Sequence, residues 1–175
     1  MYKALQLLKR PVILKGYNKV LGVNNADRIH EYLYLGNVEA SKDEYFLKAF
    51  QIGAIVNCTE NEPFSSYFDQ KPKLHIPVKD SRDDINKQIF YQYLKESTRF
   101  IKEEREKKNV ILVHCYWGLM RSATVVAVHL MDQYGFTPQR AIEYVQSKRP
   151  RALSSLYNFN DLIQKYYEEE ILTKS

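Results

Sequence analysis

The chain is poor in cysteine, with two residues among 175, and it lacks any apolar run close to the roughly 20 residues of a membrane-spanning helix. The missing run excludes such a span, and the scarcity of cysteine favours a reducing compartment, cytoplasmic, nuclear or both. The first nine residues lack a signal-peptide pattern, because lysine and glutamine interrupt their short apolar stretch. Without internal repeats, low-complexity tracts or a second domain, the sequence predicts one globular domain.

Acidic residues are absent from residues 1–22, where five basic residues account for the formal net charge of +5. We therefore divide the chain into a basic N-terminal arm, residues 1–24, and one charge-balanced domain, residues 25–175. The arm could be a solvated extension, or a short helix that docks on the domain or self-associates with a second copy. Contact with acidic lipid or RNA is a third interpretation. The basic residues are Lys3, Lys9, Arg10, Lys15 and Lys19, and the apolar stripe of the helix would be Tyr2, Leu5 and Leu8.

Strand-like and helix-like segments alternate along the rest of the chain. Strands are expected over 32–35, 54–57, 74–78 and 110–113, and helices over 42–50, 85–107, 123–131, 140–148 and 159–172. Such alternation predicts an α/β fold with a central, mostly parallel or mixed sheet flanked by helices. Ligands of these sheets bind beyond the carboxyl ends of the strands, so functional residues are expected there.

One segment, residues 114–122, lies at such a strand end and reads HCYWGLMRS. It places Cys115 and Arg121 six positions apart around Gly118, between an apolar strand and an apolar helix. The bend turns backbone N–H groups inward, and the helix start adds free N–H donors and its positive dipole end. This arrangement suits an oxyanion.

The N–H donors and the positive end of the helix dipole also favour thiolate over thiol, so Cys115 is expected to ionise readily and act as a nucleophile. The planar guanidinium of Arg121 can bind two phosphoryl oxygens together, which lysine cannot do. Gly118 allows a positive φ or close backbone approach, and the Ser122 hydroxyl can donate a hydrogen bond to the sulfur. The segment therefore predicts a phosphate-binding loop around a nucleophile.

The pattern His-Cys-x-x-Gly-x-x-Arg-Ser resembles the signature of cysteine-dependent protein phosphatases, in particular the small dual-specificity branch. Weaker matches follow in the expected order over roughly residues 28–170: residues 29–37, residues 53–59, Arg149-Pro150, and Asn158 with Phe159. The resemblance implies a protein-tyrosine-phosphatase-like fold with a sheet of about five strands. It also implies phosphoprotein substrates, a phosphocysteine intermediate, and no metal or organic cofactor.

The resemblance further implies an aspartate that protonates the leaving group. Asp80 follows a strand-like stretch and matches the acid of the family, whereas Asp83 and Asp84 precede a helical pattern and are interpreted as helix caps. His114 is expected to position the cysteine through hydrogen bonds, as in the family, with a proton shuttle as the alternative. Cys58 is interpreted as a small core residue.

The loop residues between Cys115 and Arg121 are expected to bind the substrate together with Arg121: Tyr116, Trp117, Gly118, Leu119 and Met120. Two of them depart from the commoner family pattern, which often has alanine at the position of Trp117 and a small or polar residue at that of Met120. Trp117 could form an aromatic wall beside the phosphorylated residue, or it could pack in the core. The choice between phosphotyrosine and phosphoserine or phosphothreonine stays open.

Three functions are compatible with these residues. The leading hypothesis is a dual-specificity protein phosphatase. An RNA 5′-triphosphatase could use the same cysteine loop, and only in this interpretation is RNA a partner, but Ser122-Ala123 replaces the Thr-Gly typical of that branch. A non-catalytic phosphoprotein-binding module is the third hypothesis, although such relatives usually lack the cysteine that this chain retains.

Overall fold

A computed structural model of the chain describes residues 17–18, 23–81, 83–154 and 159–174. Its centre is a five-stranded sheet with the order β3-β4-β7-β5-β6, in which β3 runs antiparallel to β4 and the other neighbours are parallel. The strands are β3 (Ala26–His30), β4 (Leu33–Gly36), β5 (Ile52–Asn57), β6 (Lys73–His75) and β7 (Val110–His114). The predicted α/β fold with a mixed, mostly parallel sheet is confirmed.

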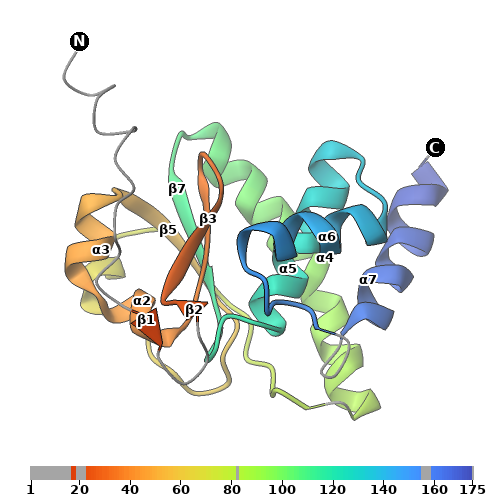
Figure 1. Cartoon of the computed structure of the whole chain (residues 1–175), viewed down its shortest axis with the longest axis horizontal. Coiled ribbons are helices and arrows are strands. Elements are labelled where there is room, and N and C mark those ends of the chain that lie inside the picture. The colour runs from red at the N-terminus through yellow and green to blue at the C-terminus, as the bar shows by residue number, and fades with distance from the viewer. Residues whose placement is uncertain (1–16, 19–22, 82, 155–158, 175) are drawn as a thin grey trace.

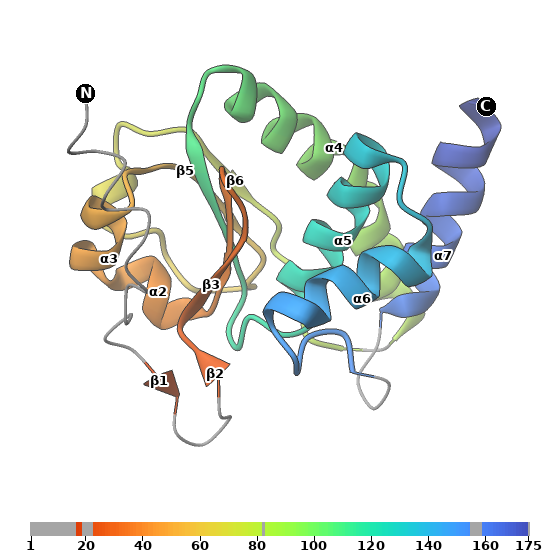
Figure 2. The same ribbon diagram turned by 45° about the horizontal axis from the view of Figure 1, so that its top comes forward.

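Helices cover both faces of this sheet (Figures 1 and 2). One face carries two short helices, α2 (Val38–Lys42) and α3 (Glu44–Ala49). The other carries α4 (Asp84–Glu106), α5 (Arg121–Tyr134), α6 (Pro138–Lys148) and α7 (Asn160–Tyr166). The chain continues from α7 through a π-helical turn, Tyr167–Ile171, into a 3₁₀ turn, Leu172–Lys174.

Strand β7 runs through the middle of the molecule because its side chains suit two apolar layers. Ile111 and Val113 face the larger cluster under α4 to α7, whereas Leu112 faces the smaller cluster under α2 and α3. The following helix, α5, buries eleven consecutive residues from Arg121 to Met131. A strand and a helix so deeply buried hold the loop between them in a fixed place.

Several predicted boundaries are wrong, two of them for a local reason that the hydrogen bonds show. The helix predicted over 42–50 is interrupted at Asp43, whose extended backbone separates α2 from α3 and whose carboxylate accepts a hydrogen bond from the Phe46 N–H (3.0 Å). The strand predicted over 74–78 stops at His75, because Val78 N–H turns back to the Ile76 carbonyl (2.8 Å). The strand predicted over 32–35 lies one residue later, at 33–36.

Two further elements differ from the sequence-based expectation. Strand β3 was not expected, because charged residues dilute its apolar pattern. The helix predicted over 159–172 is a regular α-helix only through Tyr166. The alternatives for the N-terminal arm, a solvated extension, a short helix that docks or self-associates, and contact with acidic lipid or RNA, fall mostly on residues outside the described ones, as does Asn158. Within residues 1–24 the structure describes a small antiparallel pair, β1 (Tyr17–Asn18) with β2 (Val23–Asn24).

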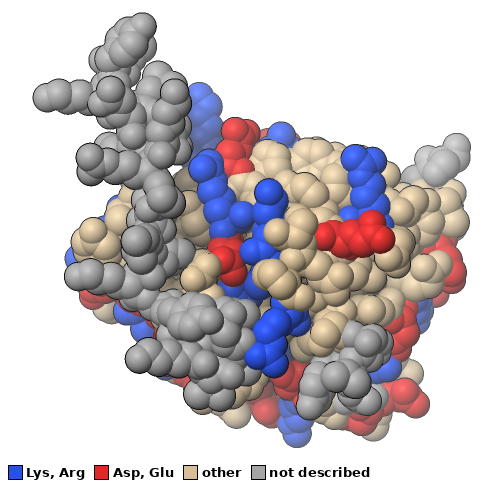
Figure 3. Space-filling model, in the orientation of Figure 1, with Lys and Arg blue, Asp and Glu red and all other residues tan. Residues whose placement is uncertain are grey.

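Among the described residues, no helix is long and apolar enough to cross a membrane. Figure 3 shows a band of Lys and Arg side chains over β3 and the end of α6, with Asp and Glu side chains beside it. Both signs of charge therefore occur on this face, in agreement with the balanced composition of residues 25–175.

A buried arginine after α6 joins distant parts of the chain. The Arg149 side chain is fully buried, and its Nη1 pairs with the Asp27 carboxylate and donates to the Asn24 carbonyl (2.9 Å). Its Nε donates to the carbonyl of Gly118 (2.7 Å), and its Nη2 to that of Trp117 (3.3 Å). One side chain thus connects α6, strand β3 and the loop between β7 and α5.

We expect Arg149→Ala to lower the free energy of unfolding by about 3–5 kcal/mol, because it leaves the Asp27 carboxylate and the loop carbonyls without their donor. The neighbouring, exposed Lys148 is the matched control, and Lys148→Ala should change stability by less than about 0.5 kcal/mol. Urea denaturation followed by circular dichroism measures both. Equal losses in the two variants would contradict this role of Arg149.

Candidate active site

The loop from Cys115 to Met120 connects the end of β7 to the start of α5, and all five of its carbonyl groups from 116 to 120 accept hydrogen bonds from outside the loop. The donors are the Val38 N–H for Tyr116 (3.2 Å), the Arg149 guanidinium for Trp117 (3.3 Å) and Gly118 (2.7 Å), the Leu153 N–H for Leu119 (3.0 Å) and the Thr124 N–H for Met120 (2.8 Å). In a trans peptide the N–H points opposite to the C=O. The loop therefore turns its N–H groups inward and forms an anion-binding nest.

Cys115 lies at the floor of this nest and is almost fully buried. Its Sγ accepts hydrogen bonds from the Gly118 N–H (3.2 Å) and the Ser122 hydroxyl (3.2 Å). Burial opposes ionisation of the thiol, but the positive charge of Arg121 and the hydrogen bonds from Ser122 outweigh it and lower the pKa of Cys115. The site therefore favours a buried thiolate, the reactive form of cysteine.

Gly118 is required by the shape of the loop. Its φ of 69° lies in the left-handed region, and a Cβ here would clash with the Gly36 carbonyl and approach the Arg149 Nη2 to 2.9 Å. A side chain at residue 118 would thus disturb both the backbone and the arginine behind it.

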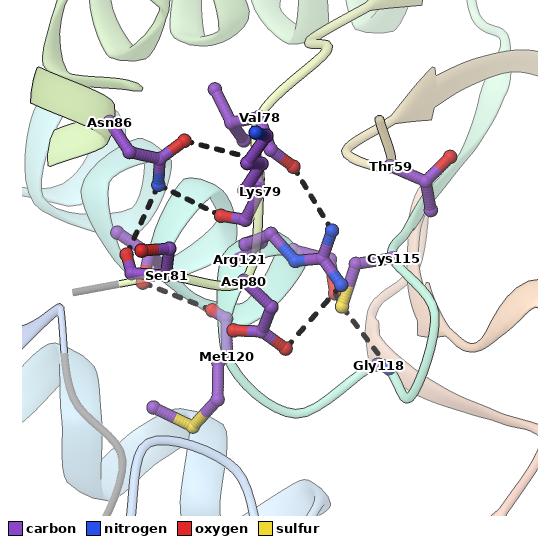
Figure 4. Close-up of polar contacts among 12 residues, drawn as sticks. Thr59, Val78, Lys79, Asp80, Ser81, Asn86, Cys115, Gly118, Met120 and Arg121 are labelled. Carbon is purple, nitrogen blue, oxygen red and sulfur yellow. Dashed lines mark hydrogen bonds and ion pairs between the residues drawn. The ribbon is translucent and has the colours of Figure 1, made fainter. Parts of the chain in front are cut away.

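Arg121 starts α5 beside the sulfur, and its side chain is nearly buried. Nη1 donates to the Val78 carbonyl (3.1 Å), and Nη2 lies 3.4 Å from the Asp80 carboxylate (Figure 4). Its buried Nε has no hydrogen-bond partner among the described residues. This N–H, next to a nest of backbone amides, can bind an oxygen of an incoming anion.

Of the three acidic candidates, Asp80 is the one that reaches Arg121, and its side chain is 43% exposed. Asp83 caps α4, because its carboxylate accepts from the Asn86 N–H (2.8 Å), and this expectation is confirmed. Asp84 is the first residue of the helix rather than a cap, so that part of the prediction is wrong. Asp80 thus combines exposure to solvent with proximity to the nest.

His114 is buried directly before the cysteine. Burial lowers the pKa of the ring to about 3, although a hydrogen bond with the Cys115 backbone opposes the shift, so the imidazole is neutral at physiological pH. A neutral, fully buried ring does not suit a proton shuttle, and its Nδ1 has no hydrogen-bond partner among the described residues, so positioning of the cysteine by hydrogen bonds of the ring stays a prediction. The backbone carbonyl of His114 accepts a hydrogen bond from the Cys58 N–H (2.8 Å), which connects the start of the loop to the end of β5.

Cys58 is fully buried in the larger core cluster, as expected. Burial, and then the charge of Cys115, raise the pKa of Cys58 well above its ordinary value. Residues 57 and 114 pair in the sheet, so the two cysteines follow paired positions on neighbouring strands. Cys58 therefore remains a thiol at the pH values at which Cys115 ionises.

The side chains at positions 116–120 divide into two groups. Tyr116 and Trp117 are 43% and 44% exposed, and their rings meet edge to face with centroids 4.9 Å apart. The interpretation of Trp117 as a core residue is therefore wrong. Met120 packs in the core and extends away from Cys115 (Figure 4), and Leu119 is half-buried.

Two residues that shape this site were missed as site residues in the sequence. Arg149 was noted only as part of a family-like segment, and Asn86 was not singled out. The contact of Arg149 has no local sequence signal, because Gly118 lies 31 positions away. Asn86 bonds residues only five and seven positions before it, and an asparagine in the first turn of the predicted helix is the signal that could have found this contact. Among the described residues, no three His, Cys, Asp or Glu side chains gather as metal ligands.

Comparisons with known proteins agree with this geometry. A family model described as dual specificity phosphatase, catalytic domain, matches residues 33–169. The chain is 32% identical over 124 residues to Dual specificity protein phosphatase 1 of Arabidopsis thaliana, an alignment that covers 71% of this chain and 60% of that protein. It is also 32% identical over 167 residues to human Dual specificity protein phosphatase 5, covering 93% of this chain and 41% of the relative. The chain thus spans less than two thirds of either relative.

Solved structures show the same fold. The crystal structure of a variant of human DUSP28 superposes with a TM-score of 0.75 at 26% identity, covering 86% of this chain and 98% of that one. The family model alone covers most of the described domain, including every residue of the Cys115 loop. The resemblance noted in the sequence is therefore confirmed, and the chain belongs to the dual specificity phosphatase branch of the cysteine-dependent phosphatases.

Proposed function

We propose that this chain hydrolyses phosphotyrosine and phosphoserine or phosphothreonine in proteins, through a phosphocysteine intermediate. The observation that carries the proposal is the Cys115 sulfur, held by Gly118 and Ser122 inside a nest whose carbonyls from Tyr116 to Met120 point outward. The family and the names of its relatives support protein substrates rather than RNA. The RNA 5′-triphosphatase alternative is not favoured.

In the first step the Cys115 thiolate attacks phosphorus, a P–S bond forms, and the P–O bond to the leaving group breaks. The inward N–H groups and Arg121 hold the remaining phosphoryl oxygens and stabilise their charge in the transition state. Binding of these oxygens to Arg121 replaces its contact with Asp80. Asp80 donates its proton to the departing oxygen.

In the second step a water molecule attacks the phosphocysteine and gives a proton to the Asp80 carboxylate. The P–S bond breaks, phosphate leaves, and the electron pair returns to sulfur as thiolate. The Ser122 hydroxyl donates to this sulfur and stabilises it as a leaving group. Each residue thereby returns to its starting state.

The exposed pair Tyr116–Trp117 follows directly after the nucleophile, so it offers an aromatic edge for the ring of a phosphotyrosine. Since the mechanism needs a reduced Cys115, we place the activity in a reducing compartment, cytoplasmic, nuclear or both.

Phosphate release from phosphotyrosine and phosphothreonine peptides, compared with release from triphosphate-ended RNA, tests the substrate class. We expect turnover of the peptides and little of the RNA. Cys115→Ser should lower kcat on the order of 10⁴-fold or more, because it removes the nucleophile. Cys58→Ser is the matched control and should retain turnover. Normal hydrolysis by Cys115→Ser would exclude the covalent mechanism.

The pH dependence of alkylation by iodoacetamide tests the electrostatics of the thiol. Because Ser122 lowers the pKa of Cys115, Ser122→Ala should shift the alkylation midpoint upward by roughly one to two pH units, the equivalent of one charge-assisted hydrogen bond. Thr124→Val is the control, since that hydroxyl bonds the Met120 carbonyl (3.0 Å) instead of sulfur. An unchanged midpoint in Ser122→Ala would refute the assigned effect.

A further inference from the structure

The segment that carries Asp80 lies between the end of β6 and the start of α4, outside the ladders of the sheet. Before Asp80, it is held by Ile76, whose N–H donates to the Asn57 carbonyl (2.8 Å), and by the turn from Ile76 to Val78. An aspartate that transfers protons must stay within hydrogen-bond reach of the leaving oxygen. The contacts that hold residues 79 to 81 therefore matter for catalysis.

The side chain of Asn86 supplies these contacts (Figure 4). Its Oδ1 accepts a hydrogen bond from the Lys79 N–H (2.9 Å), and its Nδ2 donates to the carbonyls of Lys79 (2.9 Å) and Ser81 (3.1 Å). These are the residues directly before and after Asp80. One carboxamide thus fixes the backbone on both sides of the carboxylate.

Asn86 is itself firmly held. It is buried in the first turn of α4, where its backbone N–H donates to the capping Asp83 carboxylate (2.8 Å). Phe90 and Leu94, one and two turns later, anchor the helix in the larger core cluster. The position of the carboxamide is therefore set by a packed helix and not by the loop that it binds.

The second support of this segment is Arg121, through the Val78 carbonyl (3.1 Å) and the Asp80 carboxylate. In the proposed mechanism, phosphoryl oxygens replace the contact between Arg121 and Asp80. The bonds from Asn86 do not involve the substrate, so they persist when that contact is lost. The Ser81 hydroxyl also bonds Asp83, but only on the far side of Asp80. The bonds from Asn86 are the part of the support that can hold the backbone on both sides of Asp80 through both steps.

We propose that Asn86 is a positioning residue for the proton transfers of Asp80, an inference that rests on the acid–base role proposed for Asp80 above. The role demands a side chain that accepts one hydrogen bond and donates two. A carboxamide does this, whereas a carboxylate only accepts and an alanine does neither.

Asn86→Asp and Asn86→Ala, with Asp80→Asn as reference, test the proposal on two substrates that differ in their need for an acid. Phenyl phosphate has a poor leaving group and requires protonation, whereas difluoromethylumbelliferyl phosphate releases a stable phenolate. For both Asn86 variants we expect kcat on phenyl phosphate to fall roughly 10-fold or more, with little change on the fluorinated substrate and in KM. In the Asp80→Asn background, Asn86→Asp should have almost no further effect.

Ser97→Ala is the matched control, because Ser97 is a buried residue of the same helix whose hydroxyl bonds the Leu94 carbonyl (2.7 Å), away from Asp80. Ser97→Ala should leave the ratio of the kcat values on the two substrates unchanged. Should Asn86→Ala fail to fold, Asn86→Asp decides, since it keeps the side-chain volume and introduces an acid in the first helical turn, where a negative charge is favourable. Equal losses on both substrates, or none, would overturn the role of Asn86. Absence of a selective loss in Asp80→Asn would instead overturn the role of Asp80.

Discussion

The guanidinium of Arg121 is a nearly buried positive charge that stands between the Cys115 sulfur and the segment carrying Asp80. A buried charge is costly unless it is paired, and this one is partnered by the Val78 carbonyl and the Asp80 carboxylate and lies close enough to Cys115 to favour the thiolate. The same charge therefore holds two segments together and lowers the pKa of the nucleophile. The Arg121 charge thus contributes both to the stability of this edge of the sheet and to the reactivity of Cys115.

The backbone after Cys115 meets a second demand, that the carbonyls of residues 116 to 120 find donors. Helices α2 and α5 and the segment after α6 supply these donors, so the loop is shaped from outside by distant parts of the chain. The left-handed Gly118 allows the chain to bend so far, and the Gly36 carbonyl, with Arg149 beside it, occupies the space that a side chain at residue 118 would need. The inward direction of the N–H groups is a result of this outer bonding.

How far the sequence predicts this arrangement depends on the sequence distance of each contact. Cys115, Gly118, Arg121 and Ser122 lie within one strand–turn–helix segment, and local patterns were enough to predict where they meet. The mixed sheet was also predictable, because the buried strands are apolar runs, whereas β3 was missed since Asp27 and Arg28 interrupt its pattern. The contacts of Arg149 with the loop span 31 or more positions, depend on tertiary folding and leave no local signal. Those of Asn86 span only five to seven positions, but they bond an irregular turn and not a periodic pattern. Only a family resemblance singled out Asp80 before the structure did.

The outward bonding of the loop also has a thermodynamic consequence. Because its donors come from α2, from α5 and from residues after α6, the nest exists only when these elements have all assembled. An oxyanion bound there must then favour the native state alone, and its binding is linked to folding. At one hundred times its dissociation constant such an anion adds about 2.7 kcal/mol to the free energy of unfolding. Occupancy of the site and integrity of the whole domain are thus two measures of one equilibrium.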